Sequence, residues 1–250
     1  MQNPLISKLL SCIDLGADDR AALEELCTSS MWRDAGEDLI SEGDQPSDVF
    51  LLLSGWACRY KYLRDGGRQI MAYLLPGDLC DTHVFILKTM DHSIGLLSNA
   101  EVVRIPKEAI LTLTDERPDI AKAFWWSTLV DEGVLREWLV NIGKRDAYAR
   151  LAHLFCELWV RLCHVGLTRD DQFTLPVTQE QLGDSLGLTS VHVNRVLGRM
   201  RNEGLVATRA RSVTILNGDR LHEVAGFNPN YLHLLRNPAS GQRACELDNL

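Results

Sequence analysis

The sequence has no apolar run that approaches the roughly 20 residues needed to cross a bilayer. Its longest apolar stretch, VFLLL at residues 49–53, has the length of a strand. The N-terminal segment MQNPLISKLL also lacks the basic start, the sustained apolar stretch and the cleavage site of a secretory signal. We therefore expect a cytoplasmic protein that makes no membrane contact.

The sequence also lacks paired cysteine motifs and recognisable catalytic motifs. The seven cysteines are scattered, with no C-x-x-C pair, so we expect no framework of disulfide bonds. The sequence contains no phosphate-binding loop, no metal-hydrolase spacing and no recognisable Ser/His/Asp arrangement. A triad is assembled in space, which leaves an enzyme as a remote alternative. The sequence predicts a protein that is not an enzyme.

Positive charge is scarce overall but concentrated in one segment. The chain has 26 Lys and Arg against 34 Asp and Glu, which gives a net charge of −8. Nucleic-acid binding requires clustered basic residues. Between Thr189 and Val213 five arginines stand against one acid, Glu203. A basic patch on an acidic chain is typical of a regulator that contacts DNA through one module.

Residues 39–105 consist of short β-rich runs separated by glycines. The step Asp65-Gly66-Gly67 between two such runs indicates a hairpin, because a tight turn requires positive φ. This spacing of strands predicts a small antiparallel barrel or jelly roll in an α+β protein. We expect four aromatic side chains to fill its interior: Trp32, Trp56, Tyr60 and Tyr62.

After Pro118 the pattern becomes helical, and we expect Gly143 to separate a long helix from a second helix at residues 147–162. The long helix has apolar residues on more than one face, whereas a helix that packs only on its own domain requires a single apolar face. We therefore expect it to contact both the barrel and a second copy of the chain. The expected dimerisation residues are Phe124, Trp125, Thr128, Leu135, Trp138 and Ile142. The alternative is a helix buried wholly inside one domain.

The segment TQEQLGDSLGLTSVHVNRVLGRMRNEGLV has the spacing of a helix-turn-helix. Thr178 and Gln181 form a capping box for the first helix, and Thr189 caps the second. Gly183 allows the two helices to approach closely, and Gly187 supplies a left-handed turn.

Helical periodicity places the apolar residues of the second helix on one face and a distinctive polar set on the other. Arg195 can offer a bidentate fork to guanine, Asn194 can pair with adenine, and Val191 can touch a thymine methyl. The run LVATRARSVTIL after Gly204 predicts a two-stranded wing. The expected DNA-binding residues are Thr178, Gln179, Thr189, Ser190, Val191, His192, Asn194, Arg195, Gly198, Arg199, Arg209 and Arg211.

In this order of parts the sequence resembles the Crp/Fnr family of bacterial transcription regulators, over roughly residues 5–216. The stretches that carry the resemblance are EGDQPSDVFLLLSGWACRY, LLPGDL and the helix-turn-helix segment. The resemblance implies a homodimer joined along the long helices, bound to a palindromic operator and in contact with RNA polymerase. It places Arg195 at the family's base-reading arginine. Val191 stands where many members carry glutamate, so a different half-site is expected.

The sensor segment departs from the members of the family that bind cyclic nucleotides. Its turn is Gly77-Asp78, and His92-Ser93 stands where those members carry an Arg-Ser pair. Without the guanidinium fork, cyclic AMP is not expected. The members with an iron–sulfur cluster use an N-terminal group of cysteines, whereas Cys12 and Cys27 alone cannot supply four thiolates. No such cluster is expected.

The effector therefore stays open at this point. Thiolate, imidazole and carboxylate groups lie close together in sequence near the Gly77-Asp78 turn, and haem or a metal ion is one hypothesis for them. The alternative is a structural loop with hydrogen-bonded histidines. The candidate effector residues are Gly77, Asp78, Cys80, His83, His92 and Ser93.

The sequence predicts four parts: a sensor at residues 1–116, a dimerisation helix and hinge at 117–144, a winged helix-turn-helix at 145–225 and an extension at 226–250. A homodimeric, sequence-specific DNA-binding regulator is the leading interpretation. The alternative is a ligand-, haem- or metal-binding sensor whose C-terminal domain contacts proteins. The sequence leaves open the operator, the direction of regulation and the role of the extension.

Overall fold

The computed structural model describes residues 3–82, 86 and 88–234. The chain divides into two compact units, residues 1–133 and 134–250, and the long helix α4 (Pro118–Lys144) crosses from one to the other. Among the residues described, no helix is long and apolar enough to cross a membrane.

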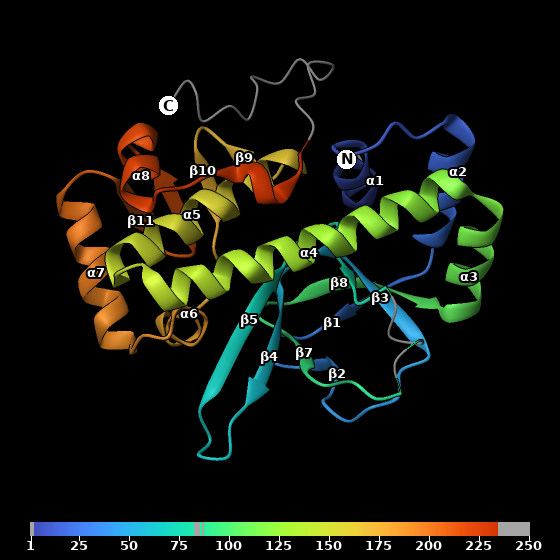
Figure 1. Cartoon of the computed structure of the whole chain (residues 1–250), viewed down its shortest axis with the longest axis horizontal. Helices are drawn as coiled ribbons and strands as arrows, with labels where there is room; N and C mark the ends of the chain where they lie inside the picture. The colour runs from blue at the N-terminus through green and yellow to red at the C-terminus, as the bar shows by residue number, and fades with distance from the viewer. Residues whose placement is uncertain (1–2, 83–85, 87, 235–250) are drawn as a thin grey trace. The chain divides into compact units, whose positions relative to one another are not determined.

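The first unit contains two four-stranded antiparallel sheets (Figure 1). One sheet has the order β1 (Ser30–Arg33), β8 (Ala100–Pro106), β3 (Asp48–Ser54) and β6 (Leu79–Cys80). The other has the order β2 (Asp38–Ile40), β7 (Ser93–Leu96), β4 (Ala57–Tyr62) and β5 (Arg68–Leu74). Of the two expected forms, the strands make a jelly-roll-like arrangement rather than a closed barrel.

The hairpin expected at Asp65-Gly66-Gly67 joins β4 and β5, and its turn stands away from the other strands of the unit (Figure 1). Gly66 has a φ of +85°, a region in which a Cβ atom would be strained. The Asp65 carboxylate accepts a 3.0 Å hydrogen bond from the Gly67 backbone N–H. The sequence signal for this turn is confirmed.

The core of the first unit lies between the sheets and four helices: α1 (Pro4–Leu10), α2 (Ala17–Leu26), α3 (Lys107–Glu116) and the first part of α4. Trp56 and Tyr60 are buried, as expected. Trp32 and Tyr62 are 69% and 60% exposed, so the expectation that they fill the interior is wrong. Side chains alternate between the faces of a strand, and aromatic content does not tell which face is inward.

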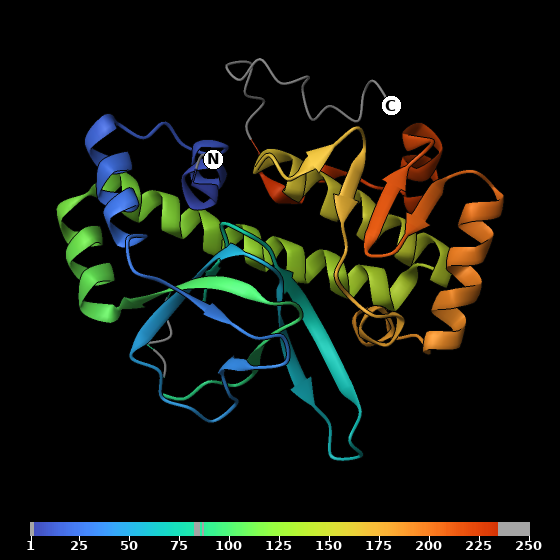
Figure 2. The ribbon, with the colours of Figure 1, turned by 180° about the vertical axis from the view of Figure 1, so that it is seen from behind.

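In the second unit, α5 (Ala147–His164) packs against α8 (Gly218–Ala225), and α6 (Gln179–Leu186) packs against α7 (Ser190–Asn202). The expected two-stranded wing is part of a larger sheet, visible in Figure 2. Its order is β11 (Val206–Arg209), β12 (Ser212–Ile215), β10 (Gln172–Thr174) and β9 (Thr168–Arg169). β9 and β10 are too short to give a clear period in the sequence.

The boundary between α4 and α5 lies beyond the expected glycine. Helix α4 continues through Gly143 to Lys144, and α5 begins at Ala147 after Asp146, whose side chain caps it. A glycine inside a helix costs about 1 kcal/mol relative to alanine, which tertiary packing can offset. The break between the two helices therefore lies at residues 145–146, just beyond Gly143, and the expected separation into two helices is confirmed.

The chain after α8 is part of the core of the second unit as far as the structure describes it. Phe227 is buried, as is Leu232 in the short 3-10 helix η1 (Pro229–Leu232). The Tyr231 hydroxyl donates a 2.9 Å hydrogen bond to the buried carboxylate of Glu157 on α5. This part of the predicted extension is thus a packed element, and residues 235–250 lie outside the described residues.

Candidate DNA-binding surface and sensor cluster

The helix-turn-helix has the local geometry that the sequence predicts. Thr178 and Gln181 form the capping box at the start of α6, and Gly187 ends α6 with a φ of +64°. A Cβ atom on Gly183 would lie 2.3 Å from the Leu188 carbonyl oxygen, so only glycine permits this crossing. The two helices are therefore held at a fixed angle by local sequence.

The two faces of α7 are also as predicted. Val193, Val196, Leu197 and Met200 are buried against the rest of the unit. Val191 is 78% exposed, and Asn194 and Arg195 are exposed on the same side. A Cβ on Gly198 would meet only the end of the Arg201 side chain, at 3.8 Å, so internal packing does not require this glycine.

Three basic side chains of this surface are unpaired. Arg195, Arg209 and Arg211 are exposed and have no side-chain hydrogen bond or ion pair with any residue that the structure describes. Arg209 and Arg211 flank Ala210, which has a φ of +53° in the turn between β11 and β12. Their positive charge is free for an external partner.

The residues expected at the helix N-termini have two different environments. The hydroxyls of Thr178 and Thr189 accept backbone N–H groups of their own helices, at 3.1 Å and 3.2 Å. Gln179 and Ser190 are exposed beside them, and His192 is half-buried. The positive ends of the α6 and α7 dipoles lie at these residues, where backbone N–H groups can bind phosphate.

Arg199 differs from the other expected DNA contacts because it is paired inside the chain. Its Nε donates to Glu203 Oε1 at 2.7 Å, and its guanidinium carbon lies 4.1 Å from the centroid of the Tyr148 ring. Helical i,i+4 spacing offers the pair with Glu203, but no sequence signal indicates the contact with Tyr148, which belongs to α5.

The expected dimerisation residues of α4 separate into two groups. Trp125 is 78% exposed and Leu135 is also exposed, whereas Thr128 and Ile142 are half-buried. Phe124 is buried in the core of the first unit, and Trp138 donates its indole N–H to Glu157 in the second unit. Phe124 and Trp138 are thus buried by contacts within their own chain, and the exposed members of the set are the ones that stay candidates for a dimer face. Helical spacing alone does not tell which apolar stripe its own domain covers.

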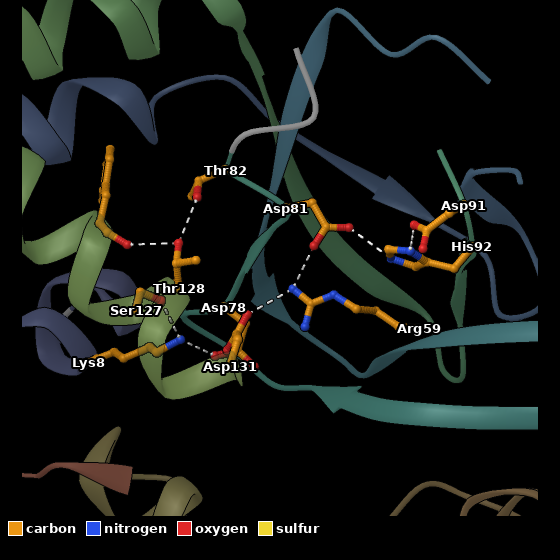
Figure 3. Close-up of polar contacts among 11 residues, drawn as sticks. Lys8, Arg59, Asp78, Asp81, Thr82, Asp91, His92, Ser127, Thr128 and Asp131 are labelled. Carbon is orange, nitrogen blue, oxygen red and sulfur yellow. Dashed lines mark hydrogen bonds and ion pairs between the residues drawn. The ribbon is translucent and has the colours of Figure 1, made fainter. Parts of the chain in front are cut away.

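In the sensor, the Gly77-Asp78 turn is held by helix α1 (Figure 3). The Asp78 carboxylate forms a 2.7 Å ion pair with Lys8 Nζ and accepts the Leu75 backbone N–H at 2.7 Å. Lys8 Nζ also donates to Ser127 Oγ on α4 at 3.2 Å. A Cβ on Gly77 would lie 2.6 Å from the Pro4 carbonyl oxygen. The turn therefore joins α1 to the sheet and to α4.

A second group of charges surrounds Arg59 on β4 (Figure 3). Arg59 Nη2 lies 3.0 Å from Asp81 Oδ1 and 2.9 Å from Asp131 Oδ2 on α4. His92 lies between Asp81 and Asp91, with Nε2 2.9 Å and Nδ1 2.8 Å from their carboxylates. We call these five residues the Arg59 cluster.

The carboxylates of the cluster favour the protonated, positively charged form of His92. Burial lowers the pKa of His92, but the hydrogen bond and charge of Asp81, together with Asp91, outweigh burial and raise the pKa above its ordinary 6.5. The pKa of Asp91 is lowered, chiefly by its hydrogen bond to His92. Ser93 is buried and accepts the Glu42 backbone N–H at 2.9 Å. His92 and Ser93 thus have partners within their own chain.

The cysteines near these sites are not placed as metal ligands. Cys80 is buried in β6, and burial raises the pKa of its thiol. Burial also raises the pKa of Cys12 to about 12 and raises that of Cys27; each thiol donates to a backbone carbonyl of the helix that precedes it. Within the described ranges, no three His, Cys, Asp or Glu residues are grouped to hold a metal ion. His83 lies outside the described residues.

Sequence reasoning missed Arg59 and Asp131. The available signal was an arginine flanked by Cys58 and Tyr60 within a strand, because a cation that becomes buried requires a nearby anion. No sequence signal identifies Asp131, 72 positions away, as the partner.

Comparison with known proteins gives matches in both units. Residues 32–117 match the cyclic nucleotide-binding domain family, and residues 149–224 match the Crp-like helix-turn-helix domain family. The chain is 25% identical over 227 residues to the fumarate and nitrate reduction regulatory protein of Vibrio cholerae, which covers 91% of this chain and 90% of that protein.

Solved structures show the same fold. FixK2 from Bradyrhizobium japonicum superposes with a TM-score of 0.70 at 23% identity, covering 78% of this chain and 96% of FixK2. A CooA mutant from Carboxydothermus hydrogenoformans superposes with a TM-score of 0.64 at 18% identity, covering 79% of this chain and 87% of CooA. The two family models and the full-length relative place the chain in the Crp/Fnr family, a family of DNA-binding transcription regulators and not of enzymes.

Proposed function

We propose that the protein is a homodimeric regulator that reads a palindromic operator through α7, one copy of the helix in each half-site. The observation that carries the proposal is the side chain of Arg195, which is exposed beside Val191 and Asn194 on α7 and has no ion pair with any described residue. This set matches the hydrogen-bond and methyl groups that the major groove displays. Arg209 and Arg211 in the wing, with Gln179, Ser190 and the half-buried His192, supply phosphate contacts.

The proposal is tested by selecting operator sequences from random duplexes with the purified full-length protein. We expect a palindromic sequence with two half-sites about one helical turn apart. Arg195→Ala should then weaken binding to that operator by about 1–3 kcal/mol per half-site, because a bidentate base contact is lost. Arg20→Ala removes an exposed arginine from α2 and serves as the matched control. Selection that returns no common sequence would refute the proposal.

We propose that dimerisation uses the exposed apolar side chains of α4. These are Trp125, Leu129, Leu135, Leu139 and Val140. They recur at helical spacing, and an exposed apolar stripe of this kind marks a protein interface. Leu129→Glu should convert the dimer to a monomer in sedimentation velocity and weaken operator binding. Leu111→Glu, at an exposed position of α3, is the control. A wild-type monomer at all concentrations would contradict the assignment.

We propose that RNA polymerase is contacted near the operator, as the family membership suggests.

We propose that the sensor responds to an effector other than cyclic AMP. The carboxylates of Asp81, Asp91 and Asp131 oppose a phosphate anion here. Asp81 and Asp91 already pair with His92, and Asp81 and Asp131 already pair with Arg59. The affinity for the operator should be the same with and without saturating cyclic AMP, and calorimetry should detect no binding. A rise in DNA affinity with cyclic AMP would contradict this part.

A further inference from the structure

The C-terminal half of α7 is attached to α5 by three side chains, Tyr148, Arg199 and Glu203, which we call the Tyr148 clamp. Glu203 Oε1 accepts from Arg199 Nε at 2.7 Å, and Glu203 Oε2 accepts from the Tyr148 hydroxyl at 2.5 Å. The Arg199 guanidinium lies over the Tyr148 ring, with 4.1 Å from its carbon to the ring centroid. Each of the three side chains therefore contacts the other two.

The clamp engages one donor atom and one face of the Arg199 guanidinium. Its charge is neutralised by Glu203, and one of its planar faces covers an aromatic ring, an arrangement that stabilises a cation. Arg195, one turn earlier on the same helix, has no such partner within the described residues. The two arginines therefore have different roles.

The clamp is anchored at the capped start of α5. Tyr148 is buried and is the second residue of α5, and its backbone N–H donates to the capping side chain of Asp146 at 2.9 Å. Burial, followed by the hydrogen bond to Glu203, raises the pKa of the Tyr148 hydroxyl to about 12. The hydroxyl is therefore a proton donor throughout the neutral range.

The two ends of α7 are thus held by different devices. The Thr189 cap and the close crossing at Gly183 hold the N-terminal end, while the clamp holds the C-terminal end. Reading base edges requires side chains placed to within about 0.5 Å, which depends on the residues that support the reading helix.

We propose that Tyr148 and Arg199 are positioning residues for sequence reading, and that Arg199 does not contact DNA. This inference rests on the proposed function. On this proposal the contact among Tyr148, Arg199 and Glu203 increases the preference for operator over random DNA. Arg199 then differs from Arg209 and Arg211, which are proposed to contact phosphates.

The test compares Tyr148→Phe and Arg199→Gln with Arg201→Gln as the matched control. Arg201 is exposed on the same helix and donates to Thr208 Oγ1 of β11, so its substitution removes the same charge outside the clamp. Operator and random duplexes are titrated over a series of salt concentrations. Both clamp variants should lower the ratio of operator to random affinity by about 2- to 30-fold.

The salt dependence separates positioning from phosphate contact. Loss of one phosphate contact lowers the slope of log affinity against log salt by about 0.9, and a homodimer would lose one such contact in each half-site. Arg199→Gln and Tyr148→Phe should leave this slope at the wild-type value. An unchanged affinity ratio in Tyr148→Phe, or a slope reduced by about 0.9 or more in Arg199→Gln, would overturn the proposal.

Hydrogen exchange in the DNA-free protein gives an independent measurement. Tyr148→Phe should speed exchange of the backbone amides near Met200 to Glu203 and leave those near Val193 unchanged, because only the C-terminal attachment is loosened. Wild-type protein without sequence preference would refute the proposed function, whereas a selective wild type with unchanged exchange in Tyr148→Phe would refute only the clamp.

Discussion

The DNA-binding surface and the Arg59 cluster use charge in opposite ways. Arg195, Arg209 and Arg211 are exposed and unpaired within the described part of the chain. Arg59 has a side chain only 13% exposed and lies within 3.0 Å of two carboxylates. The first set can neutralise an external polyanion, whereas the second neutralises charge inside the fold.

The difference indicates which basic side chains of this chain can bind an external partner and which ones stabilise the fold. A cation that already has a buried partner offers little further binding energy, since a new partner must first replace the old one. An exposed cation without a partner loses little on binding phosphate and releases counterions. Arg199 meets neither description, because its ion pair with Glu203 is exposed. Its attachment to the fold comes from the buried Tyr148 ring beneath its guanidinium.

The largest expected effect comes from Arg59→Ala. The substitution leaves Asp81 and Asp131 facing each other without their shared cation, and removing one partner of a buried pair costs about 3–5 kcal/mol. Urea unfolding should show this loss in the free energy of unfolding, in the transition of the first unit.

Arg104→Ala is the control for that comparison. Arg104 forms a 2.6 Å ion pair with Asp48, but its side chain is 57% exposed. An exposed pair contributes about 1 kcal/mol or less. Equal losses in the two variants would show that burial does not distinguish the Arg59 cluster from an ordinary surface pair.

The two units should respond to pH with opposite signs. The pKa of His92 is raised by Asp81 and Asp91, so its stabilisation is complete below about 6.5 and is lost as pH rises through the raised value. Burial, followed by the charge of Arg145, lowers the pKa of His153 to about 3. Stability that depends on neutral His153 is therefore lost as pH falls from 6.5 towards 3.

Thermal unfolding across pH 5 to 8 is the measurement for this prediction. His92→Gln should remove the loss of stability on the alkaline side, and His153→Gln should remove the loss on the acid side. The same sign of pH dependence for both residues would contradict the electrostatic assignment.

The smallest expected effect is at the reading surface. Val191→Ala removes two methyl groups that can contact a thymine methyl, and it should reduce the preference for thymine at one operator position by about 1 kcal/mol. Binding to random DNA should not change, because no charge is altered. Competition titration with operators substituted at single positions measures this preference, and a uniform loss over all positions would exclude a base contact.

The sequence predicted the helix-turn-helix well because its signals are local. The Thr178–Gln181 capping box, the left-handed Gly187 and the close approach at Gly183 each depend on residues within about ten positions of one another. The Asp65-Gly66-Gly67 hairpin was predictable for the same reason. Each signal selects a backbone conformation by sterics or by a short-range hydrogen bond.

The failures concern which face of an element is covered. Trp32 and Tyr62 have the residue type of an interior but lie on exposed faces, and Trp138 has the spacing of an interface but donates to the buried Glu157. Periodicity defines the stripes of a helix or strand, and the partner of each stripe depends on distant segments.

The sequence by itself determined the elements of DNA recognition: the caps, the turn glycine, the buried valines and the outward Arg195. Tertiary structure decided which charges meet partners on distant segments, namely Arg59 with Asp131 and Asp81, and Arg199 with the ring of Tyr148. The physical reason is range. Helix caps and turns are satisfied within a few residues, whereas a buried charge is stabilised by whichever opposite charge the fold brings within about 4 Å.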